Sequence, residues 1–266
     1  MVAHPRAPRP NGSRSDGQHF LTSAVLANEL VQQADIRPSD LVVEIGAGTG
    51  ALTRPLARRA RRVIAVERDP ALARHLRSRR DLRPAVQVVE ANALHVDLPE
   101  EPFRVVGNLP FSFGTRILRR LLDDVGGSLD RVDALVQLEM ARKRSAVSPG
   151  TLVSIGWSPW WEFAVVRRVP RSAFRPVPGV DAAMLAITRR TPELLTARQR
   201  PAFVRLLARA FRSSDRPIRR TLFAPNGRTW DAFAERRGLP RDASPPELDV
   251  FDWVALFRSS SGQPSG

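Results

Sequence analysis

The sequence contains no cysteine, a single lysine (Lys143) and no apolar run of membrane-spanning length. The absence of cysteine excludes disulfides and thiolate metal sites. The four histidines are scattered along the chain and lack the spacing of metal ligands. A membrane-spanning helix needs about 20 successive apolar residues, and a signal peptide needs an apolar segment near the N-terminus. We therefore expect a cytoplasmic protein without a metal or a membrane anchor.

Acidic side chains are in short supply relative to basic ones. Lysine and arginine total 42 against 27 for aspartate and glutamate, which gives a formal net charge of +15. A GC-rich genome replaces lysine with arginine, but such a bias does not create a surplus of cations. A surplus of this size favours a polyanionic partner over a neutral small molecule. We expect that partner to be a nucleic acid.

The middle of the chain alternates apolar runs with segments of helical periodicity. Continuous apolar runs such as Val63-Ile-Ala-Val66 are typical of parallel strands that are covered on both faces. Seven strands are predicted, at 41–45, 62–66, 85–90, 105–108, 133–138, 162–169 and 182–188, with helices at 23–34, 49–60, 70–80 and 112–122. The last two strands fit an antiparallel edge on an otherwise parallel sheet. The pattern predicts an α/β, Rossmann-like, doubly wound sheet.

Composition divides the chain into four segments. Residues 1–17, rich in Pro, Arg, Gly, Ser and Asn, predict a disordered basic arm. Residues 18–190 carry the α/β pattern. Residues 191–258 predict a small basic helical domain that binds RNA, with helices at 198–212, 229–237 and 246–257. Residues 259–266 predict a disordered tail.

A glycine-rich turn, Glu44-Ile-Gly-Ala-Gly-Thr-Gly50, follows the first strand of the predicted sheet. Glycines there let the backbone approach a ligand, and Glu67, at the end of the next strand, can accept hydrogen bonds from both ribose hydroxyls. A dinucleotide needs G-x-G-x-x-G and a helix N-terminus free for a pyrophosphate. The spacing here is G-x-G-x-G beside a carboxylate, so S-adenosylmethionine, with its ammonium and sulfonium, is the better fit. A tight turn without a ligand remains the alternative.

The stretch Asn108-Leu-Pro-Phe111 ends the fourth predicted strand. Pro110 stops the strand and favours extended geometry at Leu109, which fixes the direction of the Leu109 carbonyl. An amide oxygen, this carbonyl and an aromatic ring can together hold a planar base with an exocyclic amine, such as adenine. A strand-ending turn with a buried phenylalanine is the alternative for so short a motif. Asn92, after the third strand, is placed either to reach the adenine of a cofactor or to cap the strand end.

In this order and spacing, the motifs resemble the Erm family of ribosomal RNA adenine N6-methyltransferases, which confer resistance to macrolides, lincosamides and streptogramin B. The wider group includes the KsgA-type small-subunit rRNA dimethyltransferases. The resemblance runs from about Gln18 to the C-terminal helices. It also covers Gln18-His-Phe-Leu-Thr22, a possible lid, and Val169-Pro-Arg-Ser-Ala-Phe-Arg-Pro-Val-Pro-Gly-Val-Asp181.

The resemblance implies S-adenosylmethionine as the cofactor. Its implied contacts are His19, Leu21, Gly46, Glu67, Asn92 and Asn108. His19 stands where the family commonly has Asn, Asn92 where it has Asp, and Phe111 where Tyr is also frequent. Because His19 and Asn92 can still form hydrogen bonds, we expect altered contacts to the cofactor rather than a lost site.

The reaction implied is methyl transfer to N6 of an adenine flipped out of the peptidyl-transferase region of 23S rRNA, either naked or in early assembly. The implied catalytic residues are Asn108, Leu109, Pro110, Phe111 and Phe174. The oxygens of Asn108 and Leu109 accept the two N6 hydrogens, so catalysis rests on positioning and electrostatics without a strong base. Phe111 stacks on the base, and Phe174 either closes over its other side or anchors its loop.

Arg142, Lys143 and Arg144 follow the fifth predicted strand. We predict that they contact the RNA backbone, although such a run also fits a solvated surface. We expect a monomer.

Two other functions stay open. A KsgA-type 16S rRNA adenine dimethyltransferase shares the pattern from Phe174 to Asp181, but the short C-terminal segment and the arginine-rich arm favour the Erm type. A non-catalytic nucleic-acid-binding factor on the same fold is expected to have lost Glu67 or the Asn108 motif, and both are present. The net charge disfavours a small-molecule methyltransferase.

Overall fold

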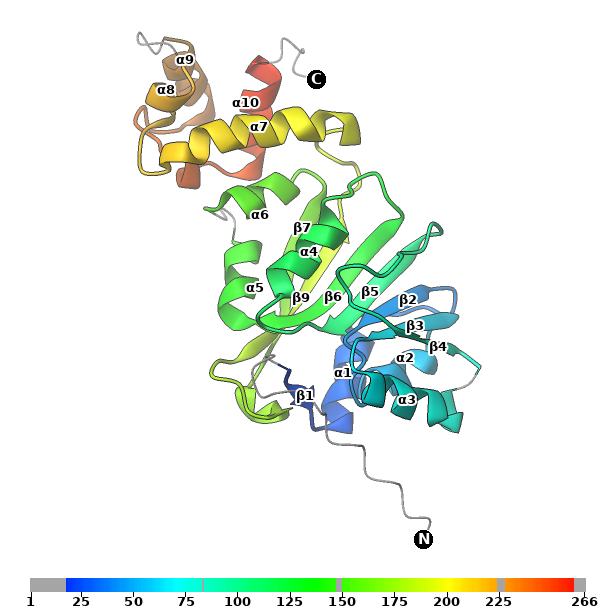
Figure 1. The fold of residues 1–266 in the computed structure, drawn as a ribbon. Coiled ribbons are helices and arrows are strands. Elements are labelled where there is room, and N and C mark those ends of the chain that lie inside the picture. Colours follow the sequence, from blue (N-terminus) through cyan, green and yellow to red (C-terminus); the bar gives the residue numbers. More distant parts are fainter. Residues whose placement is uncertain (1–17, 83, 147–149, 224–227, 261–266) are drawn as a thin grey trace. The chain divides into compact units, whose positions relative to one another are not determined.

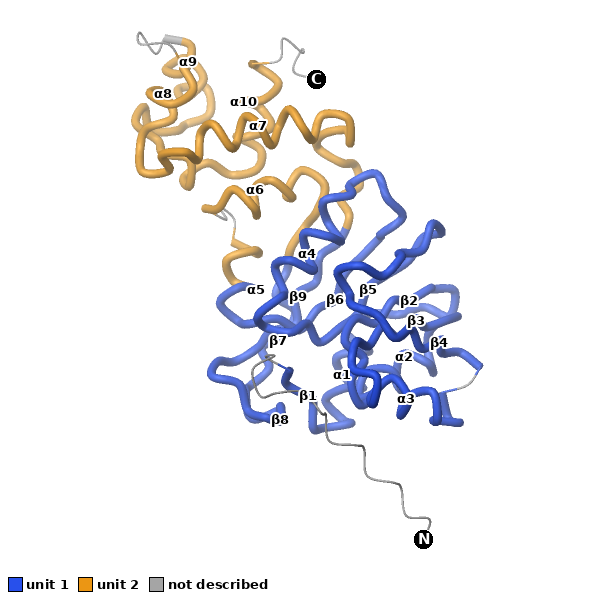
Figure 2. The backbone as a smooth tube through the Cα atoms, viewed as in Figure 1, with its two compact units in different colours: residues 1–141, 164–188 blue, residues 142–163, 189–266 orange. Residues whose placement is uncertain are grey.

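The computed structural model describes residues 18–82, 84–146, 150–223 and 228–260. The predicted basic arm and most of the predicted tail lie outside these residues. The chain divides into two compact units, residues 1–141 with 164–188 and residues 142–163 with 189–266 (Figure 2). Among the described residues, no helix is long and apolar enough to cross a membrane.

A seven-stranded mixed sheet organises the first unit (Figure 1). Its strands are β2 (Leu41–Ile45), β3 (Arg62–Glu67), β4 (Val86–Glu90), β5 (Phe103–Asn108), β6 (Leu129–Gln137), β7 (Trp161–Val169) and β9 (Ala182–Arg189). Their order is β4-β3-β2-β5-β6-β9-β7; the first five are parallel, and β9 is antiparallel to β6. The doubly wound α/β fold predicted from the sequence, with an antiparallel pair at one end of the sheet, is confirmed.

The central strands are continuous apolar runs because they are buried on both faces. Val42, Val63 and Val105 have 0% exposed surface, and each buried side chain of this size contributes about 1.5–3 kcal/mol to the hydrophobic stabilisation. Strand β6 begins at Leu129, four residues before the predicted start at 133. The polar residues Asp130 and Arg131 interrupt the apolar pattern in this extension, so a hydrophobicity pattern does not predict it.

Helices α1 (Ala24–Gln33), α2 (Thr53–Ala57), α3 (Pro70–Ser78) and α4 (Gly114–Leu122) accompany the parallel strands. Ser23 caps α1 by accepting from the Leu26 N–H, and Asp69 caps α3 through the N–H groups of Ala71 and Leu72. Helix α2 is much shorter than the predicted span of 49–60. Gly50 has a φ of +86°, which an α-helix does not accommodate, so turns precede Thr53.

The second unit is helical and built around aromatic side chains. Its helices are α6 (Leu152–Trp157), α7 (Arg200–Ala210), α8 (Ile218–Thr221), α9 (Arg228–Arg237) and α10 (Val250–Ser260). Phe203 packs edge-on against Trp160 and Phe257, with ring centroids 6.1 and 5.6 Å away. Residues 142–163, which precede the boundary predicted near 190, group with these helices. Ser259 and Ser260, assigned to the tail by composition, end α10.

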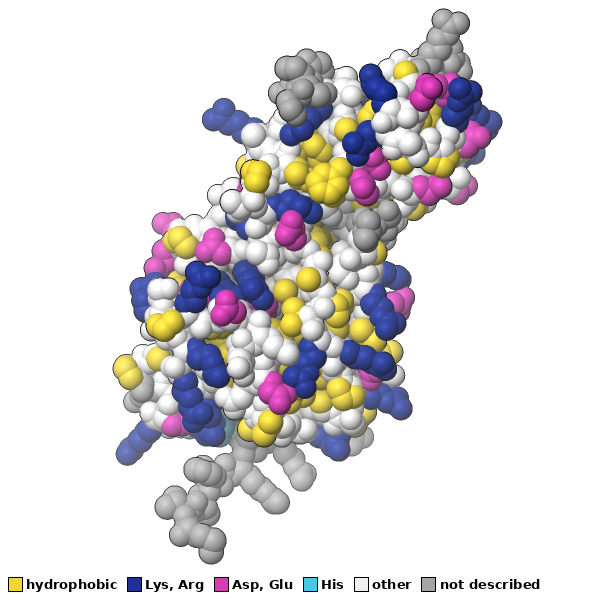
Figure 3. All heavy atoms as spheres, turned by 180° about the vertical axis from the view of Figure 1, so that it is seen from behind, with side chains coloured by type: hydrophobic (Ala, Val, Ile, Leu, Met, Phe, Trp, Pro, Cys, Tyr) yellow, Lys and Arg dark blue, Asp and Glu magenta, His cyan; other side chains and the backbone are white. Residues whose placement is uncertain are grey.

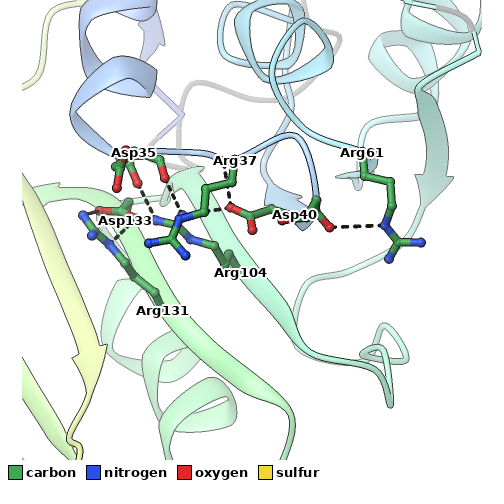
Figure 4. Close-up of polar contacts among 9 residues, drawn as sticks. Asp35, Arg37, Asp40, Arg61, Arg104, Arg131 and Asp133 are labelled. Carbon is green, nitrogen blue, oxygen red and sulfur yellow. Dashed lines mark hydrogen bonds and ion pairs between the residues drawn. The ribbon is translucent and has the colours of Figure 1, made fainter.

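A buried arginine ties together the amino-terminal edge of the sheet (Figure 4). Arg104, near the start of β5, donates to the carbonyls of Ala34 and Asp35 at the end of α1 and pairs with Asp40 at 3.0 Å and Asp133 at 3.3 Å. Arg131 donates two further hydrogen bonds to Asp133, whose side chain is fully buried. Because the two terminal nitrogens of Arg104 bond to these carbonyls and to both carboxylates, this network fixes α1 and β6 to the centre of the sheet.

Candidate cofactor and substrate cleft

A cleft opens at the carboxyl ends of the parallel strands, where the strand order reverses between β2 and β5. In open α/β sheets, ligands bind at this switch point. Eighteen residues line the cleft: Gln18, His19, Phe20, Ile45, Gly46, Val66, Glu67, Arg68, Ala91, Asn92, Ala93, Leu94, Asn108, Leu109, Pro110, Phe111, Phe113 and Ile117. All of them belong to the first unit.

The glycine-rich turn lies directly against the other walls of the cleft. Gly46 and Gly48 have φ values of +74° and +57°, in the left-handed region that favours glycine. A Cβ atom on Gly46 would lie 3.2 Å from the Asn108 carbonyl oxygen, and one on Gly48 would lie 3.0 Å from the Phe20 ring. Only a residue without a side chain lets the turn approach so closely, which is the property that a ligand-binding turn needs.

Glu67 ends β3 as a buried carboxylate with 3% exposed surface. Its Oε2 accepts a 2.8 Å hydrogen bond from the Gly48 N–H, and its Oε1 accepts one of 2.8 Å from the Asp69 N–H. These two bonds hold the carboxylate in one orientation at the cleft. Each oxygen retains a second lone pair, which suits the two hydroxyls of a ribose.

The side-chain amide of Asn108 has a defined orientation. Its Nδ2 donates a 2.5 Å hydrogen bond to the His19 carbonyl, so Oδ1 is the group left to accept a hydrogen bond from a ligand. The motif then turns sharply, because the Phe113 N–H donates to the Pro110 carbonyl at 2.9 Å. Phe111 lines the cleft and lies 5.3 Å from the His19 ring, centroid to centroid.

The segment predicted as a lid is held against residues 174–176 by a short strand pairing and by a hydrogen bond from His19. Strand β1 (Phe20–Leu21) pairs antiparallel with β8 (Phe174–Arg175). The His19 Nδ1 donates to the Pro176 carbonyl at 2.8 Å, which fixes the ring beside Phe111. Leu21 is buried and lines a smaller pocket next to the cleft.

Phe174 is placed behind the cleft rather than in its lining. Its side chain has 0% exposed surface, and its ring meets Phe111 edge to face with centroids 6.4 Å apart. The structure therefore brings Phe174 to Phe111 but leaves it no open face for a base. That Phe174 closes over a flipped adenine stays a prediction and requires the β1–β8 pair to move.

Asn92 differs chemically from the aspartate that the resemblance leads one to expect. Its Oδ1 accepts a 2.9 Å hydrogen bond from the Leu94 N–H, so its Nδ2 is the group that faces a ligand. An amide nitrogen donates to a ring nitrogen of adenine, whereas a carboxylate accepts from the exocyclic amine. Contact of Asn92 with the cofactor stays a prediction, and a bond donated by its amide nitrogen would reverse the direction of the one expected from an aspartate.

The sequence matches, over residues 9–244, the model of the family described as "Ribosomal RNA adenine dimethylase". The chain belongs to this family. It is 39% identical over 208 residues to the rRNA adenine N-6-methyltransferase of Corynebacterium diphtheriae, covering 78% of this chain and 81% of that relative. It is 34% identical over 252 residues to the mycinamicin-resistance protein MyrB of Micromonospora griseorubida, covering 94% and 80%.

The crystal structure of the 23S rRNA methyltransferase ErmE superposes with a TM-score of 0.79 at 30% identity, covering 90% of this chain and 98% of ErmE. This match confirms both the fold class and the Erm resemblance drawn from the motifs. Membership of the ribosomal RNA adenine dimethylase family also confirms the predicted enzyme class, an rRNA adenine methyltransferase.

The cationic run predicted to bind RNA lies on α5 (Leu138–Ser145), with Arg142, Lys143 and Arg144 in the second unit. Arg144 donates to Ser154 Oγ at 2.6 Å and lies over the Trp157 ring at 5.3 Å, so its guanidinium has a structural role there. Arg142 and Lys143 are exposed. Contact of these three residues with RNA stays a prediction. On the face drawn in Figure 3, basic side chains are spread widely rather than gathered in one patch.

Sequence reasoning missed several apolar residues of the cleft, among them Phe113 and Ile117. Phe113 immediately precedes α4 and Ile117 lies in its first turn, and the Arg116 guanidinium lies 5.7 Å from the centroid of the Phe113 ring. Their positions, five and nine residues after Asn108, could have indicated this. A helix that begins directly after the motif places side chains of its first turn at the cleft.

Proposed function

We propose that the protein transfers methyl groups from S-adenosylmethionine to N6 of an adenine in the peptidyl-transferase region of 23S rRNA, and that this modification gives resistance to macrolides, lincosamides and streptogramin B. The observation that carries the proposal is the Asn108 amide. Its nitrogen is bound to the His19 carbonyl at 2.5 Å, which leaves an oxygen acceptor beside Phe111 in the cleft. The resistance function of MyrB and the 23S rRNA substrate of ErmE support the choice of substrate.

The residues present fit S-adenosylmethionine. Glu67 is oriented for the ribose hydroxyls by its bonds to Gly48 and Asp69, and Asn92 presents a donor to the adenine. Gly46 lets the cofactor approach the backbone, and His19 and Leu21 close the same end of the site through β1. When bound, the cofactor supplies an electrophilic methyl group on a sulfonium.

The chain's own contribution to the reaction is positioning. The N6 of adenine is a weak nucleophile because its lone pair is delocalised into the ring. Asn108 Oδ1 and the Leu109 carbonyl accept the two N6 hydrogens, which favours pyramidal geometry and turns the lone pair towards the methyl carbon. As N6 becomes positively charged, the same oxygens stabilise it, and one proton then leaves to solvent, which returns the methylated N6 to neutrality. No side-chain base is needed at N6.

The substrate side of the cleft is apolar. Phe111 stacks on the flipped base, and Phe113 and Ile117 complete the wall. Phe174 supports Phe111 edge-on in the present conformation. The positive charge of the chain attracts RNA over a distance, and Arg142, Lys143 and Arg144 contact the RNA backbone. The substrate is naked or partly assembled rRNA, and the protein acts as a monomer.

A methyl-transfer assay tests the proposal. The full chain is incubated with labelled S-adenosylmethionine and, in parallel, with naked 23S or 16S rRNA. We expect label in 23S rRNA. Label confined to 16S rRNA contradicts the Erm-type assignment in favour of the KsgA type. Binding of rRNA and cofactor without any transfer contradicts an enzymatic role.

A further inference from the structure

One end of the cleft is formed where the neighbouring strands β3 and β4 finish. Glu67 and Glu90 are the last paired residues of these strands. Arg68 follows Glu67, and residues 91–94 follow Glu90, and all of these line the cleft. We call Arg68 and residues 91–94 the base end, because the proposed cofactor places its purine here once its ribose is at Glu67.

Asn92 uses its oxygen atoms within its own turn. Its Oδ1 accepts from the Leu94 N–H at 2.9 Å. Its backbone carbonyl accepts from the N–H groups of His95 at 2.8 Å and Val96 at 3.0 Å. A backbone N–H can bond only to the oxygen of the side-chain amide, so the orientation of this amide is settled. The Nδ2 group, with two hydrogens to donate, is left for a ligand.

The other polar groups of the base end are donors as well. The Ala93 N–H donates to no other group among the described residues, and the guanidinium of Arg68 carries donors only. The carboxylates at the two strand ends have other roles, since Glu67 is oriented for the ribose and Glu90 pairs with Arg77 at 3.0 Å. The base end therefore offers donors from its side chains and from the Ala93 N–H.

Adenine presents one donor and one acceptor along the edge that carries its amine. The exocyclic amine donates, and the ring nitrogen beside it accepts. The Ala93 N–H suits the ring nitrogen, but Asn92 Nδ2 then meets the amine donor to donor, and no bond forms between them. The opposite end of the cleft has the reverse character, because Asn108 Oδ1 and the Leu109 carbonyl are acceptors for an adenine amine.

We propose that the cleft distinguishes its two adenines by their amines. The acceptors at Asn108 and Leu109 select the amine of the target base, whereas the base end leaves the amine of the cofactor unread. Asn92 is the residue that determines this specificity. The protein consequently binds cofactors whose purine lacks the 6-amino group about as tightly as it binds adenine cofactors. This inference rests on the proposed function, because it takes S-adenosylmethionine as the cofactor and adenine as the target.

Calorimetry with two unreactive ligands tests the inference on the original chain. The ligands are S-adenosylhomocysteine and its 6-deamino analogue, in which hydrogen replaces the amine and everything else is kept. We expect the two dissociation constants to agree within about fivefold, because the analogue loses no hydrogen bond to the protein. A larger preference for S-adenosylhomocysteine would show that the amine is recognised and would overturn the inference.

The variant Asn92→Asp should create the missing preference. One oxygen of the new carboxylate still accepts from the Leu94 N–H, and the other accepts from the cofactor amine. A hydrogen bond to a charged group should raise the preference for S-adenosylhomocysteine by about tenfold or more over that of the original chain. Asn28→Asp is the matched control, because it makes the same change of charge on the exposed face of α1 and should leave the preference unchanged.

The remaining outcomes separate this inference from the proposed function. An unchanged preference in Asn92→Asp, or an equal rise in Asn28→Asp, means that Asn92 does not face the amine. If labelled methyl groups reach 23S rRNA while the original chain strongly prefers S-adenosylhomocysteine over the analogue, the proposed function stands and this inference falls. If the original chain binds neither ligand and transfers no label, both fail together.

Discussion

Replacing Asn108 with alanine tests the proposed N6 acceptor and separates it from RNA binding. In the proposed mechanism Asn108 Oδ1 accepts from an N6 hydrogen that becomes more acidic as the methyl group is transferred, so the bond strengthens in the transition state. Losing such an oriented acceptor lowers kcat by about 10²–10³-fold. If Asn108 also contacts the cofactor, as the family resemblance implies, the variant costs the cofactor one ordinary hydrogen bond of about 0.5–1.5 kcal/mol, and its affinity should fall by at most roughly 13-fold.

The assay is single-turnover methylation of naked 23S rRNA with labelled S-adenosylmethionine, paired with filter binding of the RNA. RNA affinity should stay within about threefold, because Asn108 is one contact in a large electrostatic interface. Asn28→Ala is the matched control, since the Asn28 amide bonds to the Ala24 carbonyl on the surface of α1. If Asn108→Ala methylates within tenfold of the original rate, the N6 acceptor is wrongly assigned.

Three further predictions address the stacking platform, the buried arginine and the RNA contacts. Phe111→Ala should weaken methyl transfer by about 1–3 kcal/mol in kcat/KM, with cofactor affinity nearly unchanged by calorimetry. Arg104→Ala leaves Asp133 buried beside one arginine instead of two, and urea titration should show about 3–5 kcal/mol lost from the free energy of unfolding. Arg142→Ala and Lys143→Ala should each reduce the salt slope of RNA binding by about 1 without changing stability.

Each of these predictions has a result that contradicts it. Equal losses of transfer and cofactor binding in Phe111→Ala would assign the ring to core packing. Arg61→Ala, which removes an exposed ion pair with Glu101, should cost at most about 1 kcal/mol; an equal cost for Arg104→Ala would mean that the buried network adds nothing. An unchanged salt slope in the Arg142 and Lys143 variants would show that α5 does not contact RNA.

Local sequence patterns were sufficient for the sheet and for the strand ends. Runs such as Val63–Val66 predict buried parallel strands because both faces are covered, and Glu67 and Asn108 follow at the ends of two such runs. The positive φ values in the glycine-rich turn delay the start of α2 to Thr53. Helical periodicity did not predict this, because periodicity reflects burial rather than backbone conformation.

Long-range contacts account for what the sequence did not predict. The bond between Asn108 and the His19 carbonyl joins residues 89 positions apart, and it alone decides which end of the amide accepts. Phe174 is buried in the strand β8, which pairs with β1. Strands of two residues are too short to be predicted from a sequence pattern. Glu44 was placed beside the turn from its position, but its burial against Thr53 of α2 and Glu67 of β3 depends on how these elements pack around it.

Mass-spectrometric mapping of the methylated nucleotide tests the central claim most directly. After reaction of the protein with naked 23S rRNA and S-adenosylmethionine, the rRNA is digested and each modified fragment is sequenced. The account predicts N6-methylated adenine at a site in the peptidyl-transferase region, absent when Asn108→Ala replaces the original chain. Methylation found only in 16S rRNA, or on an atom other than adenine N6, would contradict it.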